Sequence, residues 1–167
     1  MLLDLSKIIG CPGAVVPFET SLDLHTMTFG GSCPVTEPVI AAGQVRNTAG
    51  VLEMTGIVKT TLHGVCDRCT AAFTREVQYP IEAVLVPNLD SDNFESPWVF
   101  GLEHDCADLD DIVTSIFVLN MDSKLLCKVD CKGLCFRCGA NLNLGPCNCK
   151  PEPDPRFAAL QQLLDNM

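Results

Sequence analysis

Residues 127–149 have the sequence Cys127-Lys-Val-Asp-Cys131-Lys-Gly-Leu-Cys135-Phe-Arg-Cys138-Gly-Ala-Asn-Leu-Asn-Leu-Gly-Pro-Cys147-Asn-Cys149. Six of the chain's eleven cysteines lie in this stretch. Short turns between cysteines bring two sulfur atoms to one metal ion, and thiolates are ligands that zinc prefers in closed, tetrahedral sites. Gly139, directly after Cys138, allows a tight turn that points backbone N–H groups at metal-bound sulfur. The stretch therefore predicts a module that zinc stabilises.

A further cysteine pair lies far upstream, in Cys66-Asp-Arg-Cys69. The chain then has four short pairs, and eight thiolates suffice for two four-ligand zinc sites. The predicted metal ligands are Cys66, Cys69, Cys127, Cys131, Cys135, Cys138, Cys147 and Cys149.

The spacing favours one division of these ligands. The pairs 135/138 and 147/149 are separated by the length of a tight hairpin, so they can close a local, zinc-ribbon-like site. The pairs 66/69 and 127/131 would then form a long-range clasp between tail and sheet, and structural zinc contributes roughly 10–16 kcal/mol apparent in small modules. Because the spacing of 147/149 is unusual, one of these two could be a spectator with Cys131 in its place. One zinc ion is the alternative to two.

The other three cysteines, Cys11, Cys33 and Cys106, have no near neighbour of their kind. We expect them to be small, buried hydrophobic residues. Asp4 is an early acid, and no basic segment followed by an apolar run precedes the body, so a secretory signal is not expected. We therefore expect a reducing, cytoplasmic compartment, in which disulfides are rare.

Composition and periodicity predict the fold. The 167 residues are 47% apolar, with a mean hydropathy of +0.24, which allows a sizeable core in one domain. Residues 14–86 form successive strand-like runs separated by turns, one at Asn47-Thr-Ala-Gly50 and one at the Cys66/Cys69 pair. We predict an α+β fold, with an antiparallel, curled β-sheet body, a few short helices and a cysteine-rich, zinc-ribbon-like C-terminal module. Residues 1–126 are assigned to the body and 127–167 to the tail, as parts of one domain.

Helical spacing occurs in two places. Asp108 suits the N-cap of a helix over 109–119, and a final helix is predicted from Asp154 onward, after a linker at 150–153. The apolar positions expected to face the core are Leu109, Ile112, Val113, Ile116 and Leu119 in the first helix and Phe157, Leu160, Leu163 and Leu164 in the last. We expect a short strand or helix over 2–9 and a long loop over 88–105, with Trp98-Val-Phe docking onto the core.

The sequence does not favour an enzyme. Both predicted zinc sites have four protein ligands, whereas catalytic zinc keeps an open position. No metalloprotease, deaminase, nucleophile-elbow or phosphate-loop motif is present. His25, His63 and His104 stand alone, although His63 lies only three residues before Cys66. We expect no catalytic residue, no small-molecule substrate and, since the longest apolar run is short, no membrane partner.

Charge is distributed unevenly along the chain. The net charge of −10 argues against a general nucleic-acid-coating surface. The basic residues of the cysteine-rich region are Lys124, Lys128, Lys132, Arg137, Lys150 and Arg156. These cations could contact phosphates, or they could offset the two excess negative charges of each four-thiolate zinc site. The sequence leaves both open.

Several motifs together resemble the YceD family of large ribosomal RNA subunit accumulation proteins. They are the quoted cysteine stretch, the later Asp154-Pro-Arg-Phe-Ala-Ala-Leu, the upstream Gly56-x-Val-x-Thr-x-Leu with Cys66-Asp-Arg-Cys69 and Phe73, and the opening Asp4-Leu-Ser. The resemblance covers nearly the whole chain. It implies a bacterial cytosolic protein linked to the maturation or accumulation of large-subunit ribosomal RNA, with that RNA, a pre-ribosomal particle or a ribosomal protein as partner.

Our mechanistic hypothesis is that the zinc-rigidified tail presents Lys128, Lys132 and Arg137 to RNA phosphates or to a ribosomal protein. Asn141 and Asn143 could add hydrogen bonds to RNA, but we interpret them first as turn formers. Two other classes stay open: a structural protein-interaction module without RNA contact, which the acidic surface favours, and a thiol redox protein that uses Cys66 and Cys69.

Overall fold

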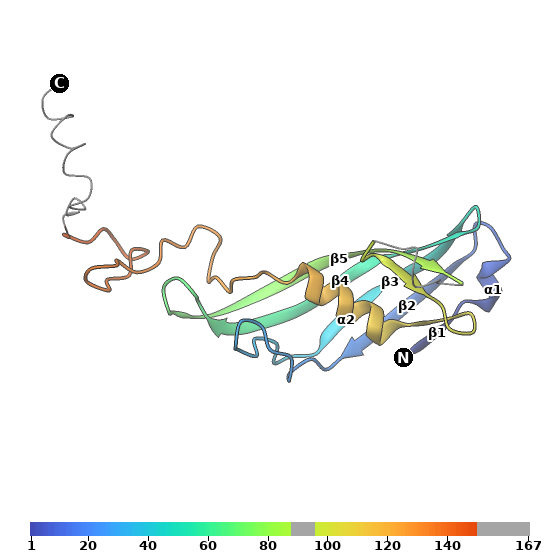
Figure 1. The fold of residues 1–167 in the computed structure, drawn as a ribbon, viewed down its shortest axis with the longest axis horizontal. Helices are drawn as coiled ribbons and strands as arrows, with labels where there is room; N and C mark the ends of the chain where they lie inside the picture. Colours follow the sequence, from blue (N-terminus) through green and yellow to red (C-terminus); the bar gives the residue numbers. More distant parts are fainter. Residues whose placement is uncertain (88–95, 150–167) are drawn as a thin grey trace, which may run out of the picture.

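The computed structural model describes residues 1–87 and 96–149 of the chain. Its centre is a five-stranded sheet with the strand order β2-β3-β4-β5-β6 (Figure 1). The strands are β2 (Val15–Leu22), β3 (Val39–Thr48), β4 (Val51–Val65), β5 (Ala72–Val86) and β6 (Val99–Gly101). Strands β2 to β5 pair antiparallel, which confirms the expected antiparallel body. Strand β6 instead pairs parallel with β5, so the loop expected over 88–105 is wrong at this strand.

A two-stranded sheet lies beside the main one. It pairs β1 (Leu2–Asp4) with β7 (Cys106–Asp108), and a one-turn helix, α1 (Ser6–Ile9), follows β1. The expectation of a strand or a helix over 2–9 is therefore met by both elements in turn. The buried side-chain amide of Asn47 donates to the carbonyls of Ile8 and Ile9 at 2.7 and 2.9 Å, which fixes α1 to the sheet.

Asn47 also closes the turn between β3 and β4. Its side-chain oxygen accepts the N–H of Gly50 at 2.8 Å, and Ala49 and Gly50 both have positive φ, 53° and 95°. Two such residues are typical of a hairpin turn whose twist matches its strands. The turn predicted at Asn47-Thr-Ala-Gly50 is confirmed.

The centre of the sheet depends on two facing glycines. Gly43 in β3 pairs with Gly56 in β4, and a Cβ atom on either would overlap a carbonyl oxygen of the other strand. The overlapped oxygens belong to Thr55 and Ala42, and the ring of Phe18 also lies against Gly43. Close approach of the two backbones therefore requires glycine at both positions.

The longest hairpin carries the first cysteine pair away from the core. Strands β4 and β5 are 15 residues each and stay paired from Leu52↔Leu85 to Val65↔Ala72. Alternate residues of β4, such as Leu52, Met54, Val58 and Leu62, are buried. Cys66 and Cys69 lie in the turn at the far end, as the sequence predicts.

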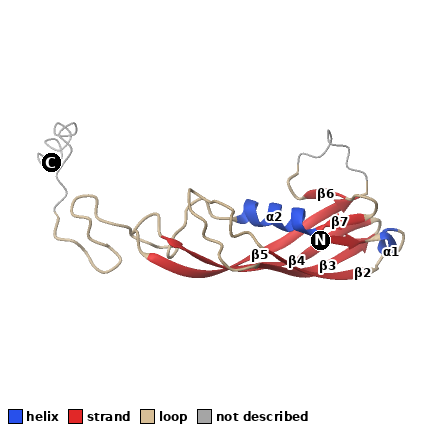
Figure 2. Cartoon of the chain, turned by 90° about the horizontal axis from the view of Figure 1, so that it is seen from below, coloured by secondary structure: helices blue, strands red, loops and turns tan. Residues whose placement is uncertain are grey.

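Helix α2 (Leu109–Asn120) covers one face of the sheet, and no helix of the described residues covers the other (Figure 2). The Asp108 carboxylate accepts the N–H of Asp110 at 3.0 Å, which confirms Asp108 as the N-cap. Leu109, Ile112, Val113 and Ile116 are buried as predicted, together with Phe117. Leu119 is 52% exposed, so its assignment to the core is wrong: it lies at the edge of the apolar face, in the last turn.

Aromatic residues complete the core under α2. Phe117 makes edge-to-face contacts with Phe29 and Tyr79, at centroid distances of 6.0 and 5.7 Å. Trp98 and Phe100 pack against the same core, which confirms the expected docking of Trp98-Val-Phe. Burying a large apolar side chain contributes about 1.5–3 kcal/mol.

The three isolated cysteines are not buried as expected. Cys11 and Cys33 are exposed, and Cys106 is half-buried. Cys11 follows α1 in a turn, and Cys33 lies in the irregular connection between β2 and β3, so neither is on a core-facing strand position. None of the described helices is long and apolar enough to cross a membrane.

The tail continues beyond the tip of the β4–β5 hairpin, at the end of the molecule opposite the N-terminus (Figure 1). Its described part, residues 127–149, contains turns and one isolated bridge, Leu134↔Asn141. The linker predicted at 150–153 and the helix predicted from Asp154 lie outside the described residues. The division into body and tail domains stays a prediction.

Candidate metal centre

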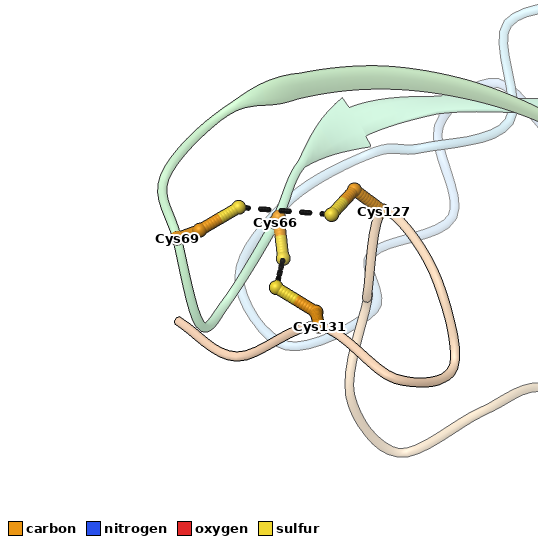
Figure 3. Close-up of side chains that lie close together, drawn as sticks. All are labelled: Cys66, Cys69, Cys127 and Cys131. Carbon is orange, nitrogen blue, oxygen red and sulfur yellow. Dashed lines mark hydrogen bonds between the residues drawn. The ribbon is translucent and has the colours of Figure 1, made fainter. Parts of the chain in front are cut away.

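Four cysteines from two distant segments meet at the tip of the β4–β5 hairpin (Figure 3). Cys66 and Cys69 come from the hairpin turn, and Cys127 and Cys131 come from the start of the tail. All four Sγ atoms lie within 4.8 Å of one another, and Cys66, Cys69 and Cys131 are buried. We call these four residues the clasp group.

The sulfur geometry of the clasp group suits a tetrahedral metal ion. Sγ of Cys66 lies 3.7 Å from Sγ of Cys131, and Sγ of Cys69 lies 3.6 Å from Sγ of Cys127. A zinc ion bonded to four sulfurs at about 2.3 Å sets them about 3.8 Å apart. Disulfide bonding would need about 2.05 Å. The donor set therefore fits zinc, which would have four protein ligands here.

The two residues between Cys66 and Cys69 fasten the tail to the hairpin. The Asp67 carboxylate accepts the backbone N–H of Leu125 at 2.7 Å, and the Asp67 N–H donates to the Leu125 carbonyl at 2.8 Å. Arg68 donates from its guanidinium to the carbonyl of Cys131 at 3.0 Å, and its own carbonyl accepts the N–H of Leu134 at 3.2 Å. These bonds hold the segment that contains both tail cysteines against the hairpin, and none of them uses a cysteine sulfur. Sequence reasoning missed both residues, although their place inside the pair was the available signal.

The other four predicted ligands form a second group within the tail. The Sγ atoms of Cys135, Cys138, Cys147 and Cys149 also lie within 4.8 Å of one another. Cys135 is buried, Cys138 is exposed, and the other two are half-buried. We call these residues the tail group. The structure thus brings the eight cysteines together in the two sets that the spacing favours, with neither Cys147 nor Cys149 left aside.

The two Cys-x-x-Cys turns share one backbone geometry. The N–H of Thr70 donates to the Cys66 carbonyl at 2.9 Å, and the N–H of Gly139 donates to the Cys135 carbonyl at 2.9 Å. Both donors are left-handed, with φ of 56° for Thr70 and 70° for Gly139. Glycine takes this conformation readily, whereas threonine takes it at a cost. The tight turn expected after Cys138 is therefore present, and a turn of the same geometry follows Cys69.

These turns direct backbone N–H groups at one sulfur in each group. Burial disfavours the Cys66 thiolate, but N–H groups of Cys127, Arg68 and Cys69 donate to its sulfur and lower its pKa to about 6. N–H groups of Cys138 and Arg137 lower the pKa of Cys135 to about 6.

A second thiol in each group shifts in the opposite direction. Burial and the neighbouring sulfurs raise the pKa of Cys127 to about 12. Hydrogen bonding with Cys138, together with burial, raises the pKa of Cys149 to about 12. Four adjacent thiolates repel one another, and a divalent cation among them would remove this obstacle to full ionisation.

Asn143 connects the two groups. In the sequence, Asn143 lies between two tail-group residues, Cys138 and Cys147. Its side-chain Nδ2 nevertheless donates to Sγ of Cys131, a clasp-group residue, at 3.3 Å. Its Oδ1 accepts the N–H of Lys132 at 2.9 Å, and its own N–H donates to the side chain of Asn141 at 3.0 Å. The interpretation of these asparagines as turn formers holds for Asn141. Asn143 in addition supports a clasp sulfur.

The predicted partner-binding cations, Lys128, Lys132 and Arg137, are all exposed in the tail. Lys128 lies 3.8 Å from Asp130, a weak surface ion pair. His63, the histidine nearest Cys66 in sequence, contacts Glu37 and Thr74 instead of either cysteine group. His25 pairs with Asp23 in the body. The described histidines therefore lie outside both groups.

This combination of a β-sheet body and two four-cysteine groups defines a protein with two candidate structural metal sites. The profile described as "Large ribosomal RNA subunit accumulation protein YceD" matches residues 54–164, and the chain belongs to this family.

Curated relatives match most of the chain, and two of them carry the family's name. An uncharacterised protein of Mycobacterium tuberculosis is 31% identical over 174 residues, covering 98% of this chain and 81% of its own length. Two chloroplastic proteins named large ribosomal RNA subunit accumulation protein YCED homolog 1 also match. The Zea mays protein is 29% identical, covering 75% of this chain and 53% of its own length. The Arabidopsis thaliana protein is 25% identical, covering 80% and 51%. No solved structure matches the chain significantly.

Proposed function

We propose that this protein is a non-catalytic ribosome-assembly factor that supports the accumulation of large-subunit ribosomal RNA in the bacterial cytoplasm. Two zinc ions hold its tail in shape, and the tail contacts precursor RNA or a ribosomal protein through Lys128, Lys132 and Arg137. The supporting observation is that eight cysteines form two four-sulfur groups. The three exposed cations lie next to, or between, the cysteines of these groups in the sequence. Family membership supports the link to ribosomal RNA.

Each zinc has a distinct part in this proposal. The ion in the clasp group fastens the tail to the β4–β5 hairpin, since its ligands come from both segments. The ion in the tail group shapes a local, zinc-ribbon-like knob, since its ligands all lie within residues 135–149. Each ion would have four cysteine ligands, which would leave no open position for water and fits a structural role.

Charge reversal in the tail tests the partner contact. The double variant Lys132→Glu/Arg137→Glu should associate at least about tenfold more weakly with precursor large subunits in a sedimentation assay, since each lost phosphate contact weakens a polyanion complex. A matched control is Lys7→Glu/Lys59→Glu, which reverses two exposed charges in the body. Both variants should retain two zinc ions. Unchanged association of the tail variant would refute the contact.

One alternative is supported by the charge of the body. Residues 1–126 carry 17 acidic and six basic side chains, a balance that suits a basic protein partner. A tail that binds only protein would then make the chain an interaction module without RNA contact. The thiol redox alternative fits less well, because Cys66 and Cys69 are only 1% and 4% exposed and lie against two further cysteines.

A further inference from the structure

Phe136 is an aromatic side chain that the described fold leaves in water. It is 89% exposed, although it directly follows the buried Cys135 of the tail group. A phenylalanine that packed fully would add to the stability of the fold by removing its apolar ring from water. Phe136 makes no such contribution within the described residues, so its place in the turn calls for another explanation.

The backbone beneath Phe136 is held firmly. The N–H of Cys135 donates to the Ala140 carbonyl at 2.8 Å, and the Cys135 carbonyl accepts the N–H of Gly139 at 2.9 Å. Sγ atoms on both sides of Phe136 belong to the tail group. Because this turn is already ordered, a ligand that stacks on the ring restricts only the side chain itself.

The surrounding charges select the kind of ligand. Residues 127–149 contain one acidic residue, Asp130, and three basic residues, Lys128, Lys132 and Arg137. The body carries the opposite balance, with its 17 acidic and six basic side chains. The net negative charge of the body therefore disfavours a polyanion there, whereas the net positive charge of residues 127–149, the segment that contains Phe136, favours one.

We propose that Phe136 stacks on an unpaired base of single-stranded RNA while Lys132 and Arg137 contact the neighbouring phosphates. This inference rests on the proposed function and specifies the form of RNA that the tail takes. Aromatic residues bind bases that are splayed out of a helix, whereas paired A-form RNA keeps its bases stacked internally. Stacking uses the π face that every base has, so the preference is for single strands and not for one sequence.

Two other strongly exposed apolar residues make it possible to distinguish base stacking from binding to an apolar protein surface. Val129 and Leu144 are 88% and 89% exposed in the same tail. An apolar protein surface would use such aliphatic side chains as readily as Phe136. Base stacking requires the aromatic ring, so Leu144→Ala is a matched control for Phe136→Ala.

The test uses the full, zinc-loaded chain and a fluorescently labelled single-stranded RNA of about 12 nucleotides of mixed sequence, alone and annealed to its complement. Phe136→Ala should weaken single-strand binding about tenfold, within the range measured for lost base stacking. Phe136→Trp should bind like the wild type, and so should Leu144→Ala. Annealing the RNA should weaken binding by the wild type.

Other results would overturn the inference. Equal single-strand affinity of the wild type and Phe136→Ala would do so, and the proposed function would still stand if Lys132→Glu/Arg137→Glu lost precursor particles. Equal losses of particle binding in Phe136→Ala and Leu144→Ala, without binding of the RNA probe, would instead assign the patch to a protein partner. A wild-type chain that bound neither RNA nor precursor particles would contradict the proposed function itself.

Discussion

The side-chain nitrogen of Asn143 lies 3.3 Å from Sγ of Cys131, so a residue within the tail group's segment donates a hydrogen bond to a ligand of the clasp group. This contact, with the bond from the Lys132 N–H to Asn143 Oδ1, links the loop between Cys138 and Cys147 to the clasp group. Hydrogen bonds to metal-bound sulfur stabilise the thiolate and orient it. The two sites are therefore expected to depend on each other.

Replacing Asn143 tests this dependence. Asn143→Ala removes the donor to Cys131 and the acceptor for Lys132, so zinc should leave the clasp group faster. Loss of such a supporting contact typically lowers metal affinity about 10–100-fold. The rate of zinc transfer to a chromogenic chelator measures the effect. Asn148→Ala, at an exposed position near the tail ligands, is the control and should match the wild type. Equal rates for all three proteins would contradict the supporting role of Asn143.

The second prediction concerns the hydrogen bond between Asp67 and Leu125, which fastens the tail to the hairpin without a cysteine sulfur. Asp67→Ala leaves the N–H of the buried Leu125 without its acceptor, which should lower the free energy of unfolding by about 1–2 kcal/mol. Asp67→Asn keeps an acceptor oxygen and should lose less than half of that amount. Urea denaturation of the zinc-loaded chain measures both. Identical losses in the two variants would mean that the bond to Leu125 is not the cause.

The two cysteine groups should differ in their effect on the body. Cys69→Ser disrupts the clasp group, which ties the tail to the hairpin, and should lower the body's unfolding midpoint by about 10 °C or more. Cys138→Ser disrupts only the tail group and should change that midpoint by no more than about 3 °C. Trp98, the chain's one tryptophan, packs against the core, so its fluorescence reports on the body. Equal midpoints in the two variants would contradict the long-range clasp.

Local patterns in the sequence predicted the elements with a short-range cause. The β3–β4 turn depends on Asn47 and on residues that tolerate positive φ, and α2 begins at a side-chain cap on Asp108. The two cysteine groups also agree with the spacing, because chain length limits which pairs can meet. The turn and the helix start need few contacts beyond their own segment, whereas the clasp group joins two segments that are distant in the sequence.

What the sequence did not predict depends on contacts between distant segments. Strand β6 exists because β5 offers an edge for parallel pairing, and three apolar residues alone do not indicate that. The exposure of Leu119 and of Cys11 depends on which other segments pack over these two positions, and local spacing does not show that. Asp67, Arg68 and Asn143 are ordinary polar residues until the fold places their partners beside them. Phe136 was missed for the converse reason, since its exposure becomes visible only when the fold of the described residues leaves the ring 89% exposed.

The metal content of the purified chain tests the account most directly. Native mass spectrometry of the untagged protein, without added metal, should give two zinc ions per chain. A thiol-alkylating reagent should then modify the exposed Cys11 and Cys33 and, more slowly, Cys106, while the eight grouped cysteines stay protected. A chain without zinc, or with one zinc and rapid alkylation of Cys66 and Cys69, would contradict the clasp between tail and hairpin.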